Sequence, residues 1–462
     1  MTLSERETRE VRRLAFPAIL HSLLQTLVFV VDRIMLGRHG EASLAAMQLG
    51  GAIEWSIWSV FASFEVGTIA RVGRHVGARD PEAARRAARI SLAMAAAMGT
   101  LLAIASPVLL ELLPYAATNV SPAALAEARA YLGVTIAASP LVFIATITVA
   151  TLQAGGDTRT PLAIGIAANV VHVGLNYLLI PVLGARGAGI STAVTFGLEA
   201  VLATLALMSV TRPVSLRARG EKIEKSGTFM GESANRTEAR MLARIAVPAF
   251  LERVLYHVGY LGYVLIIARL GDAAMAANQS LISVESICFL SADGFGIAAA
   301  ALVAQKLGAG EPEAAQRVAR IGARDAMVTL TLFGLCAVAL RNVILPAFST
   351  DPEVLAIGRA AIPVLAVAQP FMAVGIVLAQ SLRGAGRTRE ALGVSVIGAV
   401  MVRLSATWFL AITMGFGLTG VWMGSTLDWI VRSILLGVIV RRTARRLAAA
   451  RAGAEAGATL PP

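Results

Sequence analysis

Residues 77–90 read Gly77-Ala-Arg-Asp-Pro-Glu-Ala-Ala-Arg-Arg-Ala-Ala-Arg-Ile90, and residues 308–321 read Gly308-Ala-Gly-Glu-Pro-Glu-Ala-Ala-Gln-Arg-Val-Ala-Arg-Ile321. Ten of the fourteen positions are identical at an offset of 231 residues, which is half of the 462-residue chain. Self-similarity at a fixed offset indicates a repeated structural unit. We therefore expect a chain made of two equivalent halves.

The composition indicates a membrane protein. Hydrophobic residues make up 56% of the chain, charged residues only 15%, and the mean hydropathy is +0.71. A soluble chain carries about 25% charged residues. The net charge of +12 comes from arginines that lie between apolar runs, which is the pattern of cytoplasmic loops and not of a nucleic-acid-binding face. Cys288 and Cys336 lie in apolar segments and predict neither a disulfide framework nor a metal site.

A transmembrane helix needs about 20 apolar residues, and the sequence contains twelve such segments. The expected spans are Leu14–Leu36, Ala45–Ile69, Ala87–Leu113, Ala123–Leu152, Pro161–Leu183, Gly187–Val210, Leu242–Leu270, Ala274–Val303, Ala315–Leu345, Val354–Leu382, Ala391–Met414 and Leu418–Val440. The predicted fold is an all-α integral membrane protein with two six-helix lobes. No cleaved signal peptide is expected, because no small-residue cleavage site follows the first apolar run.

Charge asymmetry between loops predicts the orientation. The loops around Arg79, Arg317 and Arg387 are basic, as are both termini, whereas the alternate loops 114–122 and 415–417 are nearly free of charge. Both termini are then cytoplasmic, in a multi-pass protein of the cell's inner membrane. Because each half has an even number of spans, the halves are related by a pseudo-twofold axis along the membrane normal.

The expected domain organisation follows from these spans. Residues 1–212 form the N-terminal lobe, 213–241 a polar cytoplasmic linker, 242–442 the C-terminal lobe and 443–462 a cytoplasmic tail. The linker is too polar for a hidden soluble domain. In the doubled motif itself, Asp80 and Glu311 stand where a helix N-cap would, and Pro81 and Pro312 fit the first helical position. The motif is thus predicted to start two spans.

Several motifs resemble the multidrug and toxic compound extrusion (MATE) family, within the superfamily that includes polysaccharide and lipid-linked flippases. They are Pro17 with Val31-Asp-Arg-Ile-Met-Leu-Gly37, the doubled Gly-Ala-x-Asp/Glu-Pro-Glu loop, Leu382-Arg-Gly-Ala-Gly386 and the asparagine-containing fifth span. The resemblance implies a two-lobed antiporter that exports drugs or metabolites in exchange for protons or sodium ions. No cofactor is implied beyond that ion, and we expect a monomer that contacts membrane lipids.

Asp32 is the first candidate for ion coupling. An ionisable residue inside a span costs about 2.5–3.5 kcal/mol on insertion scales, so it requires an explanation. It either pairs with Arg33 at the interface or, as the resemblance favours, binds a cation or proton. Asn169, His172 and Asn176 share one face of the fifth span. The family's pattern has an amide at position 172. Histidine changes charge near neutral pH, so His172 either relays protons or replaces an amide donor.

The second half contributes candidates for a substrate cavity. Glu252 and Tyr256 lie in span seven, and Glu285 in span eight is the repeat mate of Glu54 in span two. These carboxylates either bind a cationic substrate or pair with Arg253, Arg403 or each other.

Three other functions compete with a MATE-type exporter. A major facilitator carrier would have a Gly-x-x-x-Asp-x-x-Gly-Arg-Arg loop after span two, which the stretch from Gly73 to Glu82 lacks. A lipid or lipid-linked oligosaccharide flippase shares the superfamily fold, but would favour a basic cavity. A membrane enzyme would need a histidine cluster or a Ser/His dyad, and the five histidines are scattered. Buried carboxylates favour a small organic cation as cargo, and His172 favours protons.

Overall fold

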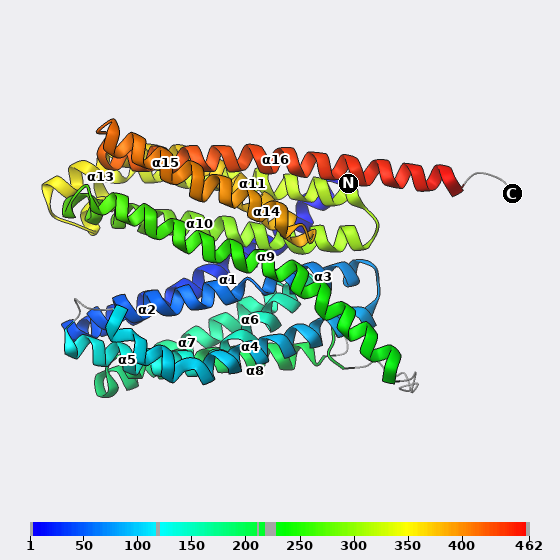
Figure 1. Cartoon of the computed structure of the whole chain (residues 1–462), viewed down its shortest axis with the longest axis horizontal. Coiled ribbons are helices and arrows are strands. Elements are labelled where there is room, and N and C mark those ends of the chain that lie inside the picture. The colour runs from blue at the N-terminus through cyan, green and yellow to red at the C-terminus, as the bar shows by residue number, and fades with distance from the viewer. Residues whose placement is uncertain (1–2, 117–120, 210–211, 218–227, 459–462) are drawn as a thin grey trace. The chain divides into compact units, whose positions relative to one another are not determined.

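The computed structural model describes residues 3–116, 121–209, 212–217 and 228–458, and every regular element within these ranges is a helix. The prediction of an all-α membrane fold is therefore confirmed. Figure 1 shows the helices running alongside one another in bundles.

Contacts divide the chain into two compact units. Unit 1 comprises Met1–Ile19 and Leu251–Pro462, and unit 2 comprises Leu20–Phe250. Unit 2 contains α2 (Glu41–Ala62), α3 (Glu65–Gly77), α4 (Pro81–Ala116), α5 (Pro122–Ala137), α6 (Ser139–Ala154), α7 (Arg159–Leu183) and α8 (Ala185–Leu207). Unit 1 contains α10 (Asp272–Gly308), α11 (Pro312–Ala339), α12 (Arg341–Ile344), η1 (Leu345–Ala347), α13 (Pro352–Gly384), α14 (Thr388–Ser395), the π-helical η2 (Val396–Val402), α15 (Arg403–Trp408), the π-helical η3 (Phe409–Thr413) and α16 (Gly417–Ala458).

The expected spans coincide with these helices. Among the described residues, nine helices are long and apolar enough to cross a membrane, or ten if the bent pair of α5 and α6 is one span. The remaining two expected spans, 14–36 and 45–69, fall on α1 (Leu3–His39) and on α2 with the start of α3. The chain is thus a multi-pass membrane protein.

Two long helices, α1 and α9 (Thr228–Ala268), are shared between the units, so the units differ from the predicted lobes 1–212 and 242–442. The start of α1 belongs to unit 1 because Val11 and Leu14 enter its apolar core and Arg12 Nε bonds Asp325 Oδ2 at 2.7 Å. The start of α9 belongs to unit 2, where Arg71 binds Glu238 at 2.5 and 2.7 Å. Residues 228–241 of the predicted linker are therefore helical, whereas 218–227 lie outside the described residues, as do 459–462 of the predicted tail.

The doubled motif starts two helices, as predicted. Asp80 caps α4 by accepting a hydrogen bond from the amide of Ala83 at 2.9 Å, and Pro81 and Pro312 are the first residues of α4 and α11. Glu311 makes no side-chain cap bond. The preceding residue has a positive φ in both copies, Arg79 at 58° and Gly310 at 75°. Glycine adopts this conformation without strain, whereas arginine does not.

The two copies of the fourth span differ in shape. In unit 2 the helices α5 and α6 meet at a bend of 51°, whereas α13 continues without interruption through Pro370, the repeat mate of Pro140. Gly99 of α4 packs against this bend so closely that a Cβ there would lie 2.5 Å from Pro140 Cα. The position 231 residues later is the buried Leu330, whose side chain excludes such an approach.

Candidate functional site

One face of α7 carries polar residues into the interior of unit 2. Gly165, Asn169, His172 and Asn176 are buried, whereas Val170 on the opposite face is exposed. The spacing of three or four residues keeps these side chains in one row. The apolar face suits lipid, and the polar row faces the other helices of the unit.

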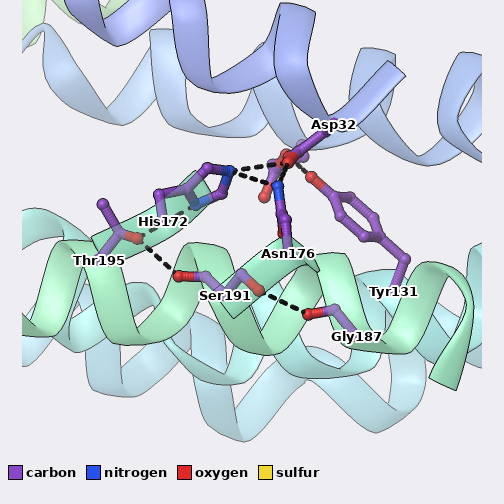
Figure 2. Close-up of polar contacts among 8 residues, drawn as sticks. Asp32, Tyr131, His172, Asn176, Gly187, Ser191 and Thr195 are labelled. Atoms are coloured by element: carbon purple, nitrogen blue, oxygen red, sulfur yellow. Dashed lines mark hydrogen bonds and ion pairs between the residues drawn. The ribbon is translucent and has the colours of Figure 1, made fainter. Parts of the chain in front are cut away.

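Asp32 of α1 meets this row (Figure 2), and its side chain is 0% exposed. Its Oδ1 accepts a hydrogen bond from Asn176 Nδ2 at 2.5 Å and lies 2.7 Å from His172 Nε2. Oδ2 of Asp32 and Oδ1 of Asn176 have no hydrogen-bond partner among the described residues. The structure thus brings together three of the four predicted coupling residues, and it places Asp32 in the interior and not in a pair with Arg33.

The hydrogen bonds around His172 determine where its protons are. Thr195 of α8 donates its hydroxyl proton to the carbonyl of Ser191 at 2.7 Å, so it can only accept from His172 Nδ1 at 3.1 Å. Nδ1 therefore carries a proton, and Nε2 faces Asp32 Oδ1. Two acceptors do not approach to 2.7 Å unless a proton lies between them. A proton between Asp32 Oδ1 and His172 Nε2 would satisfy this contact, and Asn176 Nδ2, which can only donate, lies 3.0 Å from the same nitrogen.

Asn169, the fourth predicted residue, lies apart from Asp32. Its amide donates to the carbonyl of Gly165 on its own helix at 2.9 Å. The sequence reasoning missed Thr195, although Ser191, Thr195 and Glu199 recur every four residues along α8 and so share a face. That spacing was the available signal.

Glu54 of α2 was predicted for the substrate cavity, but the structure places it in the closed interior of unit 2. It is 0% exposed, and Tyr131 of α5 donates a hydrogen bond to its Oε2 at 2.5 Å. Asp32 and Glu54 both act electrostatically on Tyr131. Glu54 therefore belongs to the polar interior around Asp32 and does not line an open surface.

Glu252, a second candidate for the cavity, is buried in an ion pair. Arg383 of α13 donates to Glu252 Oε1 at 2.5 Å, and Ser395 donates to the same atom at 2.5 Å. A carboxylate with these partners is already compensated. This geometry corresponds to pairing with an arginine, although with Arg383 and not with Arg253.

Glu285 and Tyr256 are the more accessible candidates in unit 1. Both are half-buried, and no hydrogen bond or ion pair from a described residue engages the Glu285 carboxylate. Arg403 and Arg432 act on it electrostatically. Of the four predicted cavity residues, these two retain groups that a ligand could contact.

Unit 1 has a different polar centre at the place that corresponds to Asp32. Asp428 of α16 accepts from Arg403 Nε at 2.8 Å and from Arg432 Nε at 2.6 Å. Arg432 stacks on Trp429 at 3.8 Å from the ring centroid, and Arg403 lies 5.7 Å from the ring centre of Tyr263. The three charged members of this centre, Asp428, Arg403 and Arg432, are all in ion pairs.

The register of the repeat relates the two centres. Tyr263 follows Asp32 by 231 residues, and Arg403 follows His172 by 231. In the last span the offset is 233. Two pairs of glycines show this register: Gly184 and Gly417 have φ of 55° and 56°, and Gly187 and Gly420 lie close to the backbone carbonyls of Leu179 and Leu410. Thr195 then corresponds to Asp428, and Glu199 to Arg432.

A polytopic helical membrane protein with an internal repeat, and with a buried carboxylate–histidine pair in one unit, belongs to the class of membrane transporters. The model of the MatE family matches residues 17–178 and 248–409, most of the chain and both halves of the repeat. The chain therefore belongs to the MATE family of transporters.

Relatives and solved structures agree with this assignment. The chain is 25% identical to the probable multidrug resistance protein NorM of Thermotoga maritima, covering 92% of this chain and 90% of that protein. It is 29% identical to the probable multidrug resistance protein NorM of Bradyrhizobium diazoefficiens, over 95% and 94% of the two chains. The structure of the Vibrio cholerae MATE transporter VcmN in the bent form matches with a TM-score of 0.86 at 18% identity, covering 97% of this chain and 99% of that one. This last likeness shows the fold.

Proposed function

We propose that the protein is a secondary multidrug exporter that exchanges organic cations for protons by alternating access. The relatives named as multidrug resistance proteins support the cargo class. The observation that carries the proton coupling is the arrangement of Asp32 and His172, which are fully buried 2.7 Å apart. Binding or losing one proton changes the charge of this pair by one unit in a site closed to water, where that change has its largest effect.

The state of unit 1 supports a cationic cargo over the anionic headgroup that a flippase would carry. Three arginines that could attract an anion, Arg383, Arg403 and Arg432, are each bound to a carboxylate. Glu285 has no such partner among the described residues, and Tyr256 supplies an aromatic ring on the preceding helix, α9. A carboxylate and an aromatic ring are both suitable contacts for an organic cation.

Transport by reconstituted protein tests the proposal. The full chain in liposomes would be given a pH gradient or a sodium gradient, each alone, with ethidium as a fluorescent organic cation. We expect ethidium movement driven by the pH gradient and its loss in Asp32→Asn. Glu111→Gln removes an exposed carboxylate of the same unit and serves as the matched control. Transport driven by sodium alone, or unchanged pH-driven transport in Asp32→Asn, would overturn proton coupling.

The orientation belongs to the same proposal, with a monomer in the inner membrane and both termini in the cytoplasm. A cysteine-free background allows one thiol at a time to be labelled in intact cells with a membrane-impermeant reagent. Tyr115→Cys, at the exposed end of α4, should react from outside. Arg79→Cys, in the loop before α4, should react only after the cells are opened. The reverse pattern would invert the proposed orientation.

A further inference from the structure

We propose that His21 and Glu199 form a second proton-binding station in unit 2, through which protons reach or leave the Asp32–His172 pair. The inference rests on the proposed function, because it assumes that Asp32 exchanges a proton. Neither residue was among the candidates from the sequence. Both come from helices that already supply the site.

The station lies on the same helix faces as Asp32, His172 and Thr195. His21 precedes Asp32 by eleven residues on α1, Gly165 precedes Asn176 by eleven on α7, and Glu199 follows Thr195 by four on α8. Eleven residues are three helical turns, or about 16 Å of rise. The station is therefore displaced from Asp32 along the helix axes, towards the N-terminal ends of α1 and α7 at Leu3 and Arg159.

Both residues are buried, and a buried ionisable group in a membrane span requires an explanation. Glu199 is 3% exposed and His21 is 4% exposed. Among the described residues, no hydrogen bond or ion pair reaches the carboxylate of Glu199. An ionisable group in a span without a charge partner is costly and commonly marks an ion or proton pathway.

His21 lies beside Gly165, within reach of the Pro161 backbone, on the side where Glu199 also approaches. Gln25 places its amide nitrogen 3.4 Å from His21 Nε2, and an amide nitrogen can only donate. In the neutral ring, Nε2 then accepts and Nδ1 carries the proton. Nδ1 has no hydrogen-bond partner among the described residues.

The absence of a side chain at Gly165 allows His21 and Glu199 to approach the same place. A Cβ at this position would lie 2.9 Å from His21 Nδ1 and 3.8 Å from Glu199 Oε1. The two polar atoms are thus closer to each other than the sum of those distances, although they form no direct ion pair. The proposal places one water molecule between them, since water commonly bridges polar groups that do not touch directly. Only glycine leaves that space open.

The charged residues on the helices packed against α8 do not pair with Glu199. The ionisable residues of α8 and the helices packed on it are Arg186 of α8, Arg159, His172 and Tyr177 of α7, Glu127, Arg129 and Tyr131 of α5, and Glu41 and Glu54 of α2, whereas α6 has none. None of them forms an ion pair or hydrogen bond with Glu199 in the described part of the chain. In unit 1 the residue equivalent to Glu199 is Arg432, which is locked to Asp428. At this position, therefore, unit 2 has an unpaired carboxylate and unit 1 has a paired arginine.

The step itself is a proton transfer. A proton that arrives from the Asp32–His172 pair through intervening water binds His21 at its unprotonated Nε2, while the Nδ1 proton passes through the bridging water to the Glu199 carboxylate, which becomes a neutral acid. No bond other than O–H and N–H is made or broken, and the reverse sequence returns the proton.

Infrared spectroscopy after a rapid pH jump tests the station without any cargo. The carbonyl stretch of a protonated carboxyl reports Asp32 and Glu199, and Asp32→Asn and Glu199→Gln assign the two bands. We expect Glu199→Gln to slow protonation of Asp32 by about tenfold or more, because a positioned proton donor accelerates transfer by about 10²–10⁴. The final extent of Asp32 protonation should be nearly unchanged. Glu199→Asp should restore part of the rate, and Glu111→Gln should have no effect.

The outcomes separate the two proposals. If Asp32 shows no pH-dependent band in the wild-type chain, the proposed function fails. If Asp32 is protonated equally fast in Glu199→Gln and in His21→Gln, the station is refuted while the proposed function stands. A Gly165→Ala variant, in which a methyl group fills the meeting point, should reproduce the slow rate of Glu199→Gln. A wild-type rate in that variant would contradict the bridging geometry.

Discussion

The polar centres of the two units occupy equivalent places in the repeat but differ in charge. In unit 2 the place holds Asp32, His172 and Thr195, with Asp32 Oδ1 2.7 Å and Thr195 Oγ1 3.1 Å from the two ring nitrogens of His172. In unit 1 it holds Tyr263, Arg403 and Asp428, and the carboxylate is bound by two arginines. Arginine keeps its charge at all accessible pH values, whereas histidine does not. One scaffold therefore holds a carboxylate bound by two arginines in one unit and, in the other, the carboxylate–histidine pair that we propose to bind protons.

The largest effect is expected from removing the carboxylate of the cluster formed by Asp428 and the two arginines. Asp428→Asn leaves Arg403 and Arg432 buried without a counter-charge, and should destabilise the protein by about 3–5 kcal/mol. Thermal unfolding in detergent, followed by circular dichroism, measures the change. The double variant Asp428→Asn/Arg403→Met should recover part of the loss. A small shift for Asp428→Asn alone would show that the cluster is hydrated and not closed.

The different bends of the two units can be tested at Gly99. Gly99→Ala places a methyl group 2.5 Å from Pro140 Cα, on backbone that cannot rotate away. We expect a loss of about 1–3 kcal/mol in unfolding stability. Gly174→Ala, which has no atom within 4 Å of the new methyl group, is the control and should be neutral or stabilising. Equal stability of the two variants would contradict the close packing of α4 on the bend.

The two buried tyrosines, Tyr131 and Tyr263, are expected to differ in how much their hydroxyl groups contribute to stability. Tyr131→Phe removes the hydrogen bond to Glu54, and should cost about 1–2 kcal/mol because a buried carboxyl loses its partner. Tyr263→Phe should change stability by less than about 0.5 kcal/mol, since no described residue forms a hydrogen bond with its hydroxyl and the ring remains beside Arg403. Chemical denaturation of both variants in the same detergent would measure the difference. A larger loss for Tyr263→Phe would reverse the comparison.

The smallest effect is expected at Thr195, which is equivalent to Asp428 in the repeat. Thr195→Val removes the acceptor of the His172 Nδ1 proton, so the ring is no longer held in place beside Asp32. The rate of pH-driven ethidium transport should therefore fall by up to about tenfold, which corresponds to about 1.4 kcal/mol. Thr195→Ser keeps the hydroxyl and should retain the wild-type rate. An unchanged rate in Thr195→Val would show that Thr195 does not hold the ring.

Much of the site could be predicted from the sequence because its members are local to one helix. Asn169, His172 and Asn176 fall on one face by spacing alone, and an aspartate within an apolar run stands out at position 32. The cavity candidates were harder to place. Glu54 and Glu285 are repeat mates, yet one is buried against Tyr131 and the other is half-buried. A repeat conserves backbone positions, whereas the neighbours of each side chain depend on residues that differ between the halves.

The sequence by itself determined the membrane-spanning helices, the internal repeat and the family, because hydropathy and helical periodicity act over a few turns of one segment. Only the tertiary structure decided which helices share a unit, so that the first residues of α1 pack with α10 and α11. It also decided that Thr195 is hydrogen-bonded to His172 and that His21 and Glu199 both lie beside Gly165. These contacts join residues on three helices, and close packing, not the pattern of any one segment, fixes which of their atoms meet.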